Sequence, residues 1–259
     1  MRFKSFGSTD VGRNRDHNED HFLCNEVHRL FLVADGMGGH ASGETASSLA
    51  IQSLEEFITK SKTKKIKYPL KIRKDLSPEQ NRLLNAIVYS DRVLREHGEI
   101  NPSTKGMGTT IVAAIIEDDH LAIANVGDSR IYQIRDGFIK QITIDHTLVE
   151  EQERIGIITK NQAKNHPYRH ILTVALGHID NISKIDISKT KIEKKDLYLI
   201  CSDGLYNMLD NKEILTTIQS NMHSHKNGAV KKTCLSLLNK ANLAGGLDNI
   251  TAILISFFE

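Results

Sequence analysis

Acidic residues stand close to one end of four short apolar runs in this sequence. The runs are 30–34, 121–126, 197–201 and 250–258, and the acids near their ends are Asp35, Asp128, Asp203 and Asp248. Continuous apolar runs of this length predict strands that are buried on both faces. Asp-Gly and Asp-Asn steps predict turns where the chain leaves the core. A single such step is usually only a turn, but four of them can meet at one edge of a sheet.

Carboxylates that gather at one place repel one another and raise one another's pKa, unless a cation neutralises them. We therefore interpret the four aspartates as ligands of a divalent metal. Carboxylate, carbonyl and water oxygens suit Mg²⁺ or Mn²⁺ rather than zinc. No two cysteines have the Cys-x₂₋₄-Cys spacing of a zinc finger.

Two helix pairs and a series of strands are predicted around these positions. Apolar residues at helical spacing predict helices over 42–58, 79–96, 211–222 and 226–244. The stretch 110–143 contains consecutive strands with tight turns, including a hairpin at Arg135-Asp136-Gly137-Phe138. Strands that follow one another without helices pair antiparallel. This order predicts an α+β fold with paired helices over antiparallel sheet.

The composition is that of a globular protein without a strong charge bias. The 259 residues include 34 Lys and Arg against 32 Asp and Glu, a formal charge of +2, which argues against a nucleic-acid binder. No window reaches the ~18 consecutive apolar residues of a membrane-spanning helix, and the N-terminus lacks a secretory signal pattern. We expect a cytoplasmic protein that binds neither nucleic acid nor membrane. Its three cysteines are odd in number and widely spaced, which argues against a disulfide framework.

Two further segments stand out. Residues 60–74, here called the basic loop, contain no acidic residue. Such a run is either a solvated linker between two helices or a docking surface for an acidic partner, and the sequence leaves both interpretations open. The polar, weakly periodic stretch 146–170 is long for a loop inside a compact domain, and loops of that length are more often functional than not.

Eight short motifs occur in order along the chain. They are Asp10-x-Gly12-x-x-Arg15-x-x-Asn18-Glu19-Asp20, Val33-Ala34-Asp35-Gly36-Met37-Gly38-Gly39-His40, Gly106-Met107-Gly108-Thr109-Thr110, Asn125-Val126-Gly127-Asp128-Ser129-Arg130, Asp145-His146-Thr147, Ala175-Leu176-Gly177, Cys201-Ser202-Asp203-Gly204-Leu205 and Gly246-Leu247-Asp248-Asn249-Ile250-Thr251. Together they closely resemble the bacterial form of the type 2C metal-dependent protein serine/threonine phosphatases, over about residues 10–255.

This resemblance implies one catalytic domain over 1–259. Its fold would be a central antiparallel β-sandwich flanked by pairs of antiparallel helices, in four α-β-β-α layers. A basic inter-helix loop would lie near 60–78, and a mobile flap, here the flap segment, near 146–175 beside a cleft. The cleft would hold two Mn²⁺ or Mg²⁺ ions and, as in bacterial members, a third and weaker ion.

The resemblance also assigns site residues, motif by motif. Asp35 would bridge both ions. Asp20 and the Gly36 carbonyl would complete one side, and Asp203 and Asp248 the other. The remaining assignments are Asp128 for the third ion, Glu19 beside the metal ligands, and Arg15 for the substrate phosphate.

The implied activity is hydrolysis of phosphoserine and phosphothreonine monoesters in proteins by direct attack of a metal-bridging hydroxide. Two ions ~3.5–4 Å apart can share a water and lower its pKa, and the planar Arg15 fork suits two phosphoryl oxygens. The enzyme would be a monomer that opposes a bacterial serine/threonine kinase.

Two positions depart from the family pattern. Many eukaryotic members carry His directly after the Asp-Gly step, where this chain has Met37. His40 is a candidate substitute as the acid that protonates the leaving group, and a metal-bound water is the alternative. Bacterial relatives usually have Arg before Ala-Leu-Gly, where this chain has Val174.

Three other functions compete with this interpretation. The segment Gly36-x-Gly38-x-x-Ala41 fits a dinucleotide-binding fingerprint locally, but a run of strands follows where that fold needs alternating helices. A cysteine-nucleophile phosphatase needs Cys-x₅-Arg, and Arg29 follows Cys24 one residue too soon. A catalytically silent phosphatase-like binding module would lose metal-binding acids, whereas every expected aspartate is present.

Overall fold

The computed structural model describes residues 1–38, 41–64, 66–222 and 228–258. Its centre is a pair of antiparallel sheets. One sheet has the strand order β1 (Arg2–Asp10), β11 (Ile250–Phe258), β10 (Leu197–Cys201), β7 (Arg130–Arg135) and β8 (Phe138–Gln141). The other has the order β2 (Asp20–Asn25), β3 (Leu30–Met37), β5 (Ile111–Glu117), β6 (His120–Val126) and β9 (Asp186–Lys191), and the short β4 (Gly108–Thr109) pairs with β3.

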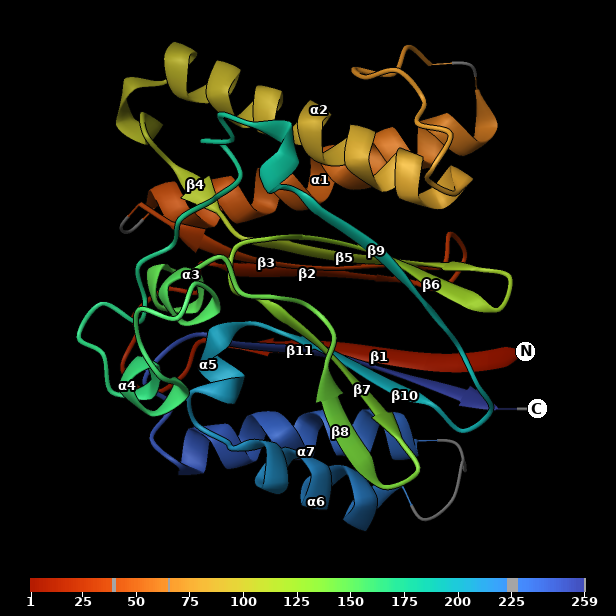
Figure 1. The fold of residues 1–259 in the computed structure, drawn as a ribbon, viewed down its shortest axis with the longest axis vertical. Helices are drawn as coiled ribbons and strands as arrows, with labels where there is room; N and C mark the ends of the chain where they lie inside the picture. The colour runs from red at the N-terminus through yellow and green to blue at the C-terminus, as the bar shows by residue number, and fades with distance from the viewer. Residues whose placement is uncertain (39–40, 65, 223–227, 259) are drawn as a thin grey trace.

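A helix pair covers the outer face of each sheet, as Figure 1 shows. The helices α1 (Ala41–Thr63) and α2 (Pro78–Ile100) lie on the sheet that contains β3, and α6 (Asn211–Asn221) and α7 (Ala229–Leu243) lie on the sheet that contains β11. The four α-β-β-α layers confirm the predicted fold class. None of the described helices is both long and apolar enough to cross a membrane.

Three apolar layers hold the sandwich together. Phe31 and Val33 of β3 pack between the sheets with Tyr198 and Ile253, whereas Leu32 faces the helices α1 and α2. Since both faces of the central strands are covered, these strands read as continuous apolar runs rather than as alternating patterns. This explains why the strands that carry the acidic positions were visible in the sequence.

The predicted elements are found with small shifts of their ends. The helix predicted over 42–58 continues to Thr63, and that predicted over 79–96 runs from Pro78 to Ile100, where Ser77 and Gln80 form a capping box. The basic loop therefore includes the last turn of α1. The hairpin at 135–138 is confirmed, since Asp136 and Gly137 both have positive φ between β7 and β8.

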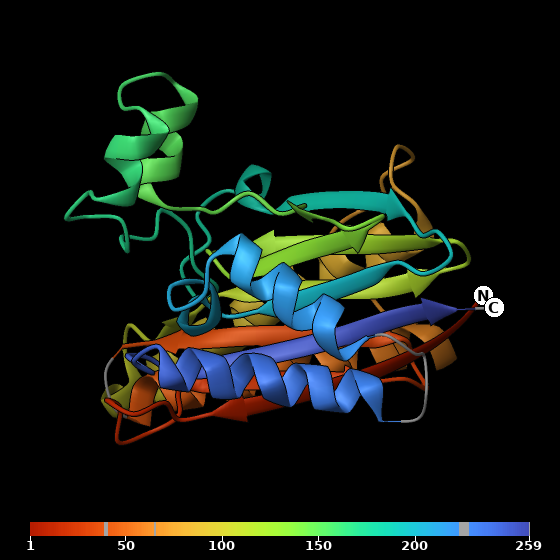
Figure 2. The same cartoon turned by 90° about the horizontal axis from the view of Figure 1, so that it is seen from below.

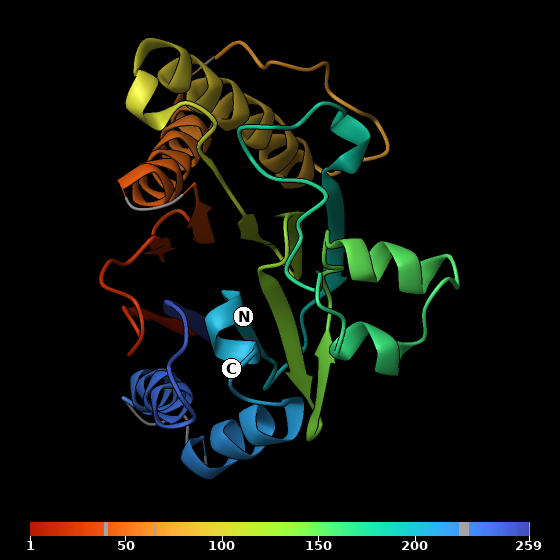
Figure 3. The ribbon, with the colours of Figure 1, turned by 90° about the vertical axis from the view of Figure 1, so that its left-hand side faces the viewer.

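The flap segment projects from one end of the sandwich, as the turned views show (Figures 2 and 3). It contains two short helices, α3 (Leu148–Arg154) and α4 (Lys160–Lys164), which the sequence pattern did not predict. Backbone hydrogen bonds close its base: the Leu148 N–H donates to the Ile171 carbonyl, and the Thr173 N–H donates to the His146 carbonyl. The remaining short helices are η1 (Pro102–Thr104), η2 (Ile182–Lys184) and α5 (Asp203–Tyr206).

Removing side-chain volume from the core layer under α1 tests this packing. Leu54 is fully buried there, so we expect Leu54→Ala to lower the free energy of unfolding by about 3–5 kcal/mol, from lost burial and from the cavity left behind. The matched control is Leu243→Ala, whose side chain is 68% exposed on α7, with an expected change below about 0.5 kcal/mol. Urea unfolding of both variants measures the difference, and similar losses would contradict the layer assignment.

Candidate metal centre

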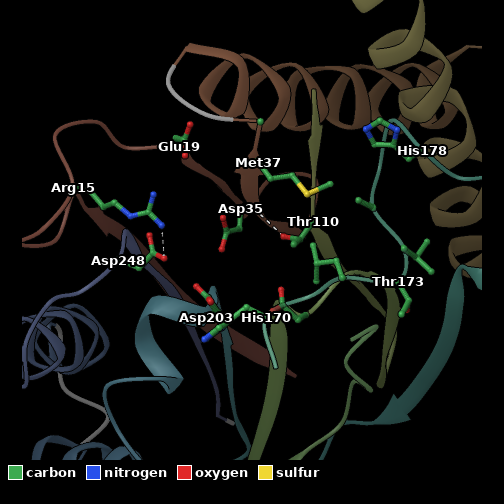
Figure 4. Close-up of a pocket in the computed structure, with 16 residues that line it drawn as sticks. Arg15, Glu19, Asp35, Met37, Thr110, His170, Thr173, His178, Asp203 and Asp248 are labelled. Carbon is green, nitrogen blue, oxygen red and sulfur yellow. Dashed lines mark hydrogen bonds and ion pairs between the residues drawn. The ribbon is translucent and has the colours of Figure 1, made fainter. Parts of the chain in front are cut away.

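A cleft of about 570 Å³ is lined in part by residues 170 and 172–175 of the flap segment and so lies beside it. Five of the predicted metal ligands line it: Asp35, Gly36, Asp128, Asp203 and Asp248. Asp20 is buried and is not among the lining residues, whereas Arg15 and Glu19 are. Figure 4 shows the side chains of Asp35, Asp203 and Asp248 pointing toward one another across this space.

Strand pairing explains why acids from distant segments meet. Asp20 begins β2 and is paired in register with Asp35 near the end of β3. Asp203 lies two residues after the end of β10, and Asp248 lies two residues before the start of β11, which is the antiparallel neighbour of β10. Asp128 lies in the turn between β6 and β7. All five positions are thus strand ends at one end of the sandwich.

A close contact fixes the two C-terminal acids relative to each other. A Cβ on Gly204 would stand 2.0 Å from the carbonyl oxygen of Asn249, so only glycine allows the two turns to touch here. The Ser202 hydroxyl donates to Asp20 Oδ2 at 2.6 Å and accepts from the Thr251 N–H at 3.0 Å. One buried serine therefore ties the acid of β2 to the ends of β10 and β11.

Gly36 is held by an equally close contact. A Cβ there would stand 2.0 Å from the Gly43 carbonyl oxygen, because the first turn of α1 packs directly against β3. The Gly36 N–H donates to the Glu19 carbonyl at 3.1 Å. These contacts bring Gly36 and Glu19 to the same wall of the cleft.

Burial changes the acidity of the cluster. It is the largest cause that raises the pKa of Asp20 and Asp128 to about 7 and of Asp203 to about 6, and it raises the pKa of Asp35 well above its usual value. Neighbouring carboxylates raise these pKa values further. Near neutral pH the cluster cannot carry its full negative charge without a compensating cation.

The unpaired oxygens of the cluster fit a cation. Asp20 Oδ1 and Asp203 Oδ1 are buried and have no hydrogen-bond partner among the described residues. A buried carboxylate oxygen without a donor is costly, and a hard divalent cation is the ligand that such an oxygen accepts best. This observation supports the residues present as a site for Mg²⁺ or Mn²⁺.

The described acidic side chains of the cleft do not converge on one ion position. No group of three or more Asp, Glu, His or Cys residues in the described part of the chain forms a ready ligand set for one ion. A site for hydrated ions needs no such ready set, since Mg²⁺ keeps several water ligands and takes only one or two carboxylates.

Arg15 extends into the cleft from the segment between β1 and β2. Its guanidinium forms an ion pair with Asp248 Oδ2 at 2.8 Å, and its side chain is 47% exposed (Figure 4). The predicted phosphate-binding residue therefore stands directly beside a predicted metal ligand.

Asn249 and Thr110 position the site, and the sequence reasoning assigned no role to either. The buried Asn249 amide donates to the carbonyls of Val11 and His17 at 2.8 and 2.9 Å, and its oxygen accepts from the Glu19 N–H at 2.8 Å. It thereby holds the segment that carries Arg15. The Thr110 hydroxyl accepts from the Asp35 N–H at 3.0 Å. An Asn beside an Asp-containing turn is too common a pattern to indicate this function.

Other cleft residues come from the flap side. His170, Thr173 and the nearly buried Val174 line the cleft, as does His178, whose ring nitrogen lies 3.2 Å from the Gly106 carbonyl oxygen (Figure 4). The two histidines were not singled out from the sequence. The candidate acid His40 lies outside the described residues.

The structure argues against two of the competing functions. The fingerprint at Gly36 follows a strand of an antiparallel sheet, so the parallel β-α-β unit of a dinucleotide site is absent around it in the described residues. Cys201 is fully buried, which raises the pKa of its thiol, and Cys24 does not line the cleft. Neither cysteine is placed as a nucleophile.

Comparison with known proteins agrees with the site. The family model described as protein phosphatase 2C matches residues 10–239. The chain is 36% identical to the serine/threonine phosphatase stp of Listeria welshimeri over 260 residues, covering 95% of this chain and 93% of that protein. It is 32% identical to the protein phosphatase PhpP of Streptococcus pneumoniae over 254 residues, covering 97% and 96%.

Solved structures show the same fold. The serine/threonine phosphatase of S. agalactiae matches with a TM-score of 0.84 at 33% identity, covering all of both chains. The catalytic domain of the phosphatase PstP in complex with two manganese ions matches with a TM-score of 0.80 at 30% identity, covering 99% of both chains. With the motifs, the sandwich and the acidic cleft in agreement, this chain belongs to the protein phosphatase 2C family.

Proposed function

We propose that this chain is a metal-dependent protein phosphatase that hydrolyses phosphoserine and phosphothreonine monoesters in proteins. The observation that carries the proposal is the meeting of four aspartates from distant segments at one cleft, with the buried Asp20 paired in register with Asp35 beside it. Two carboxylate oxygens of this group, on Asp20 and Asp203, are buried without a described donor. The same acids argue against a catalytically silent binding module, which has no need to hold them at this electrostatic cost.

The motif assignments say which residues would hold two cations. Asp35 would be shared by both ions, Asp20 and the Gly36 carbonyl would complete one place, and Asp203 and Asp248 the other; Asp128 would serve a third ion, with Glu19 beside the ligands. The presence of Asp35, Gly36, Asp128, Asp203 and Asp248 along one cleft, and the register pairing of Asp20 with Asp35, support this proposal. Two bound divalent cations supply charge that offsets the phosphoryl oxygens and acidify water for direct attack on phosphorus. We propose Mn²⁺ or Mg²⁺ for both places.

Arg15 binds the phosphoryl group in this proposal. Its guanidinium now neutralises Asp248. With Asp248 serving as a metal ligand, the planar fork of Arg15 would be free to donate to two phosphoryl oxygens. Its partial exposure at the cleft mouth suits a group that must meet a substrate arriving from solvent.

We further propose that residues 1–259 act as one catalytic domain, as a monomer in the cytoplasm, on proteins phosphorylated by a serine/threonine kinase. One continuous apolar layer between the sheets supports the single domain. The printed names of the relatives, which are serine/threonine phosphatases, support the substrate class.

Substitution of the central acids tests the metal centre. We expect Asp35→Asn and Asp203→Asn each to lower kcat on a phosphothreonine peptide with Mn²⁺ by at least about 100-fold, because each removes a ligand charge, while circular dichroism shows a retained fold. Asp119→Asn, an exposed acid in the β5–β6 turn, is the matched control and should keep wild-type activity. Substantial Mn²⁺-dependent turnover in either cleft variant would contradict the assignment.

Substitution of Arg15 tests substrate binding. We expect Arg15→Ala to raise KM about tenfold or more with a smaller loss of kcat, because the side chain binds substrate and transition state alike. Arg15→Lys should recover only part of the loss, since an ammonium cannot form the bidentate contact. Steady-state kinetics separates the two constants, and an unchanged KM in the alanine variant would refute the role.

The raised pKa values predict a pH-dependent response to metal. The folded-state pKa values of Asp20 and Asp203 lie at about 7 and 6, above the ordinary value of 3.8. At pH values between the ordinary pKa and these raised pKa values, the folded protein therefore binds more protons than the unfolded chain. The stability contributed by the protonated acids is present at low pH and is lost as pH rises toward 7.

Bound Mn²⁺ replaces these protons and should offset the loss. We expect a saturating concentration near 100 times the dissociation constant to stabilise by about 3 kcal/mol at pH 8 and by much less at pH 5.5. Thermal unfolding with Mn²⁺ or EDTA at both pH values measures the effect, and Asp203→Asn should reduce it. A metal-induced shift in melting temperature that is equal at both pH values would count against the cluster as the binding site.

A further inference from the structure

The basic loop carries the excess positive charge of the protein. Its 15 residues contain eight Lys or Arg and no acid, which leaves 26 basic against 32 acidic residues in the other 244, a net charge of −6. A protein of overall charge +2 is thus an acidic body with one strongly basic segment. Such an uneven distribution attracts acidic partners to one place.

The loop is held in place rather than loosely tethered. Ile66, Tyr68 and Leu70 pack against the apolar layer under α1 and α2. Two fully or almost fully buried amides of α2 fix its backbone: Asn85 Oδ1 accepts from the Leu70 N–H at 2.7 Å, and Asn81 Oδ1 accepts from the Arg73 N–H at 2.8 Å. A solvated linker needs no such buried polar anchors.

The acids around the loop are already paired. Lys60 pairs with Glu56, Arg73 with Asp75, and Lys62 with Glu79. The remaining described lysines of the loop are Lys64, Lys67, Lys71 and Lys74. All four are exposed, and none forms an ion pair with another described residue. Ile72, which lies between Lys71 and Lys74 in the sequence, adds an apolar side chain that is 60% exposed.

The loop lies far from the cleft. The helix α1 begins beside Gly36 and ends at the loop, and its 23 residues span about 34 Å. Figure 1 shows the loop at the end of the molecule that holds both chain termini, opposite α3 and α4. A contact made there cannot touch the phosphoryl group that is being hydrolysed.

From the fixed backbone, the four unpaired lysines and the distance to the cleft, we infer that the basic loop docks an acidic segment of the phosphoprotein substrates. This inference rests on the proposed function for its substrate class. A polypeptide fits better than a lipid surface, because the loop's only aromatic residue, Tyr68, packs edge-on against Phe57 at 5.5 Å instead of facing outward as an interfacial anchor. The docked segment raises the local concentration of a phosphorylated site tethered to it.

Two phosphothreonine peptides with the same core test the inference. One carries six glutamates joined through a flexible Gly/Ser linker of about 40 residues, whose root-mean-square length of about 35 Å spans the distance; the other carries six glutamines instead. We expect kcat/KM of the wild type to be about tenfold higher for the glutamate peptide at low salt, and the advantage to disappear at high salt.

Charge-reversal variants locate the effect. Lys64→Glu, Lys67→Glu, Lys71→Glu and Lys74→Glu together should abolish the advantage while leaving hydrolysis of para-nitrophenyl phosphate unchanged. The matched control reverses four exposed lysines elsewhere with the same change of net charge: Lys140, Lys189, Lys212 and Lys232. It should keep most of the advantage. Equal losses in both variants would overturn the loop as a docking site and indicate a general charge effect.

A binding measurement separates docking from catalysis. Fluorescence anisotropy of a phosphate-free glutamate peptide should give a dissociation constant about tenfold weaker for the loop variant than for the wild type. If wild type hydrolyses neither peptide, the proposed function fails while this measurement still tests docking. An unchanged dissociation constant, or a loop-dependent binding confined to phosphatidylglycerol vesicles, would overturn the inference.

Discussion

The mutual repulsion of carboxylates at one end of the sandwich is the constraint on which the rest of the structure depends. Asp20 and Asp35 face each other in strand register, and Asp203 and Asp128 are nearly buried beside them. Left to themselves, such groups would move apart into water. They stay together because Asp35, Asp128, Asp203 and Asp248 stand at the ends of strands whose apolar side chains are buried on both faces, and because Asp20 is held by its register with Asp35 and by the hydroxyl of Ser202. Burial of the strands thus holds in place the charges that a cation then requires.

The turns around the cleft determine the geometry of the site as much as the aspartates do. Gly36 and Gly204 let neighbouring backbones approach where any side chain would collide with a carbonyl group. Ser202 and Asn249 then link segments that lie far apart in sequence through single polar side chains. The aspartates provide the charge, and these small and polar residues decide how closely the charges can be brought together.

The residue patterns predicted paired helices over antiparallel sheet and four of the acids for identifiable physical reasons, whereas the four-layer sandwich followed from the family resemblance. The central strands are covered on both sides, so the ends of these strands are visible in the sequence as the limits of apolar runs. The acids close to those ends are Asp35, Asp128, Asp203 and Asp248. Asp20 has no apolar run before it, and only its motif pointed to the site. The roles of Asn249 and Ser202 were not predictable, because they depend on hydrogen bonds to residues that lie 182 or more positions away. The helices α3 and α4 are too short for a periodic pattern and rely on threonine caps.

The pairing of β1 with β11 affects how the molecule can be assembled. These strands join residues 2–10 to residues 250–258 over nine consecutive register pairs. A chain that emerges from the ribosome must therefore keep its first strand unpaired on this side until its last strand is made. Since Asp248 lies two residues before β11, the cleft is among the later features to form. Nascent chains would then be unable to act on phosphate esters until residues 248–258 have been made, and such long-range closure is typical of slow folding.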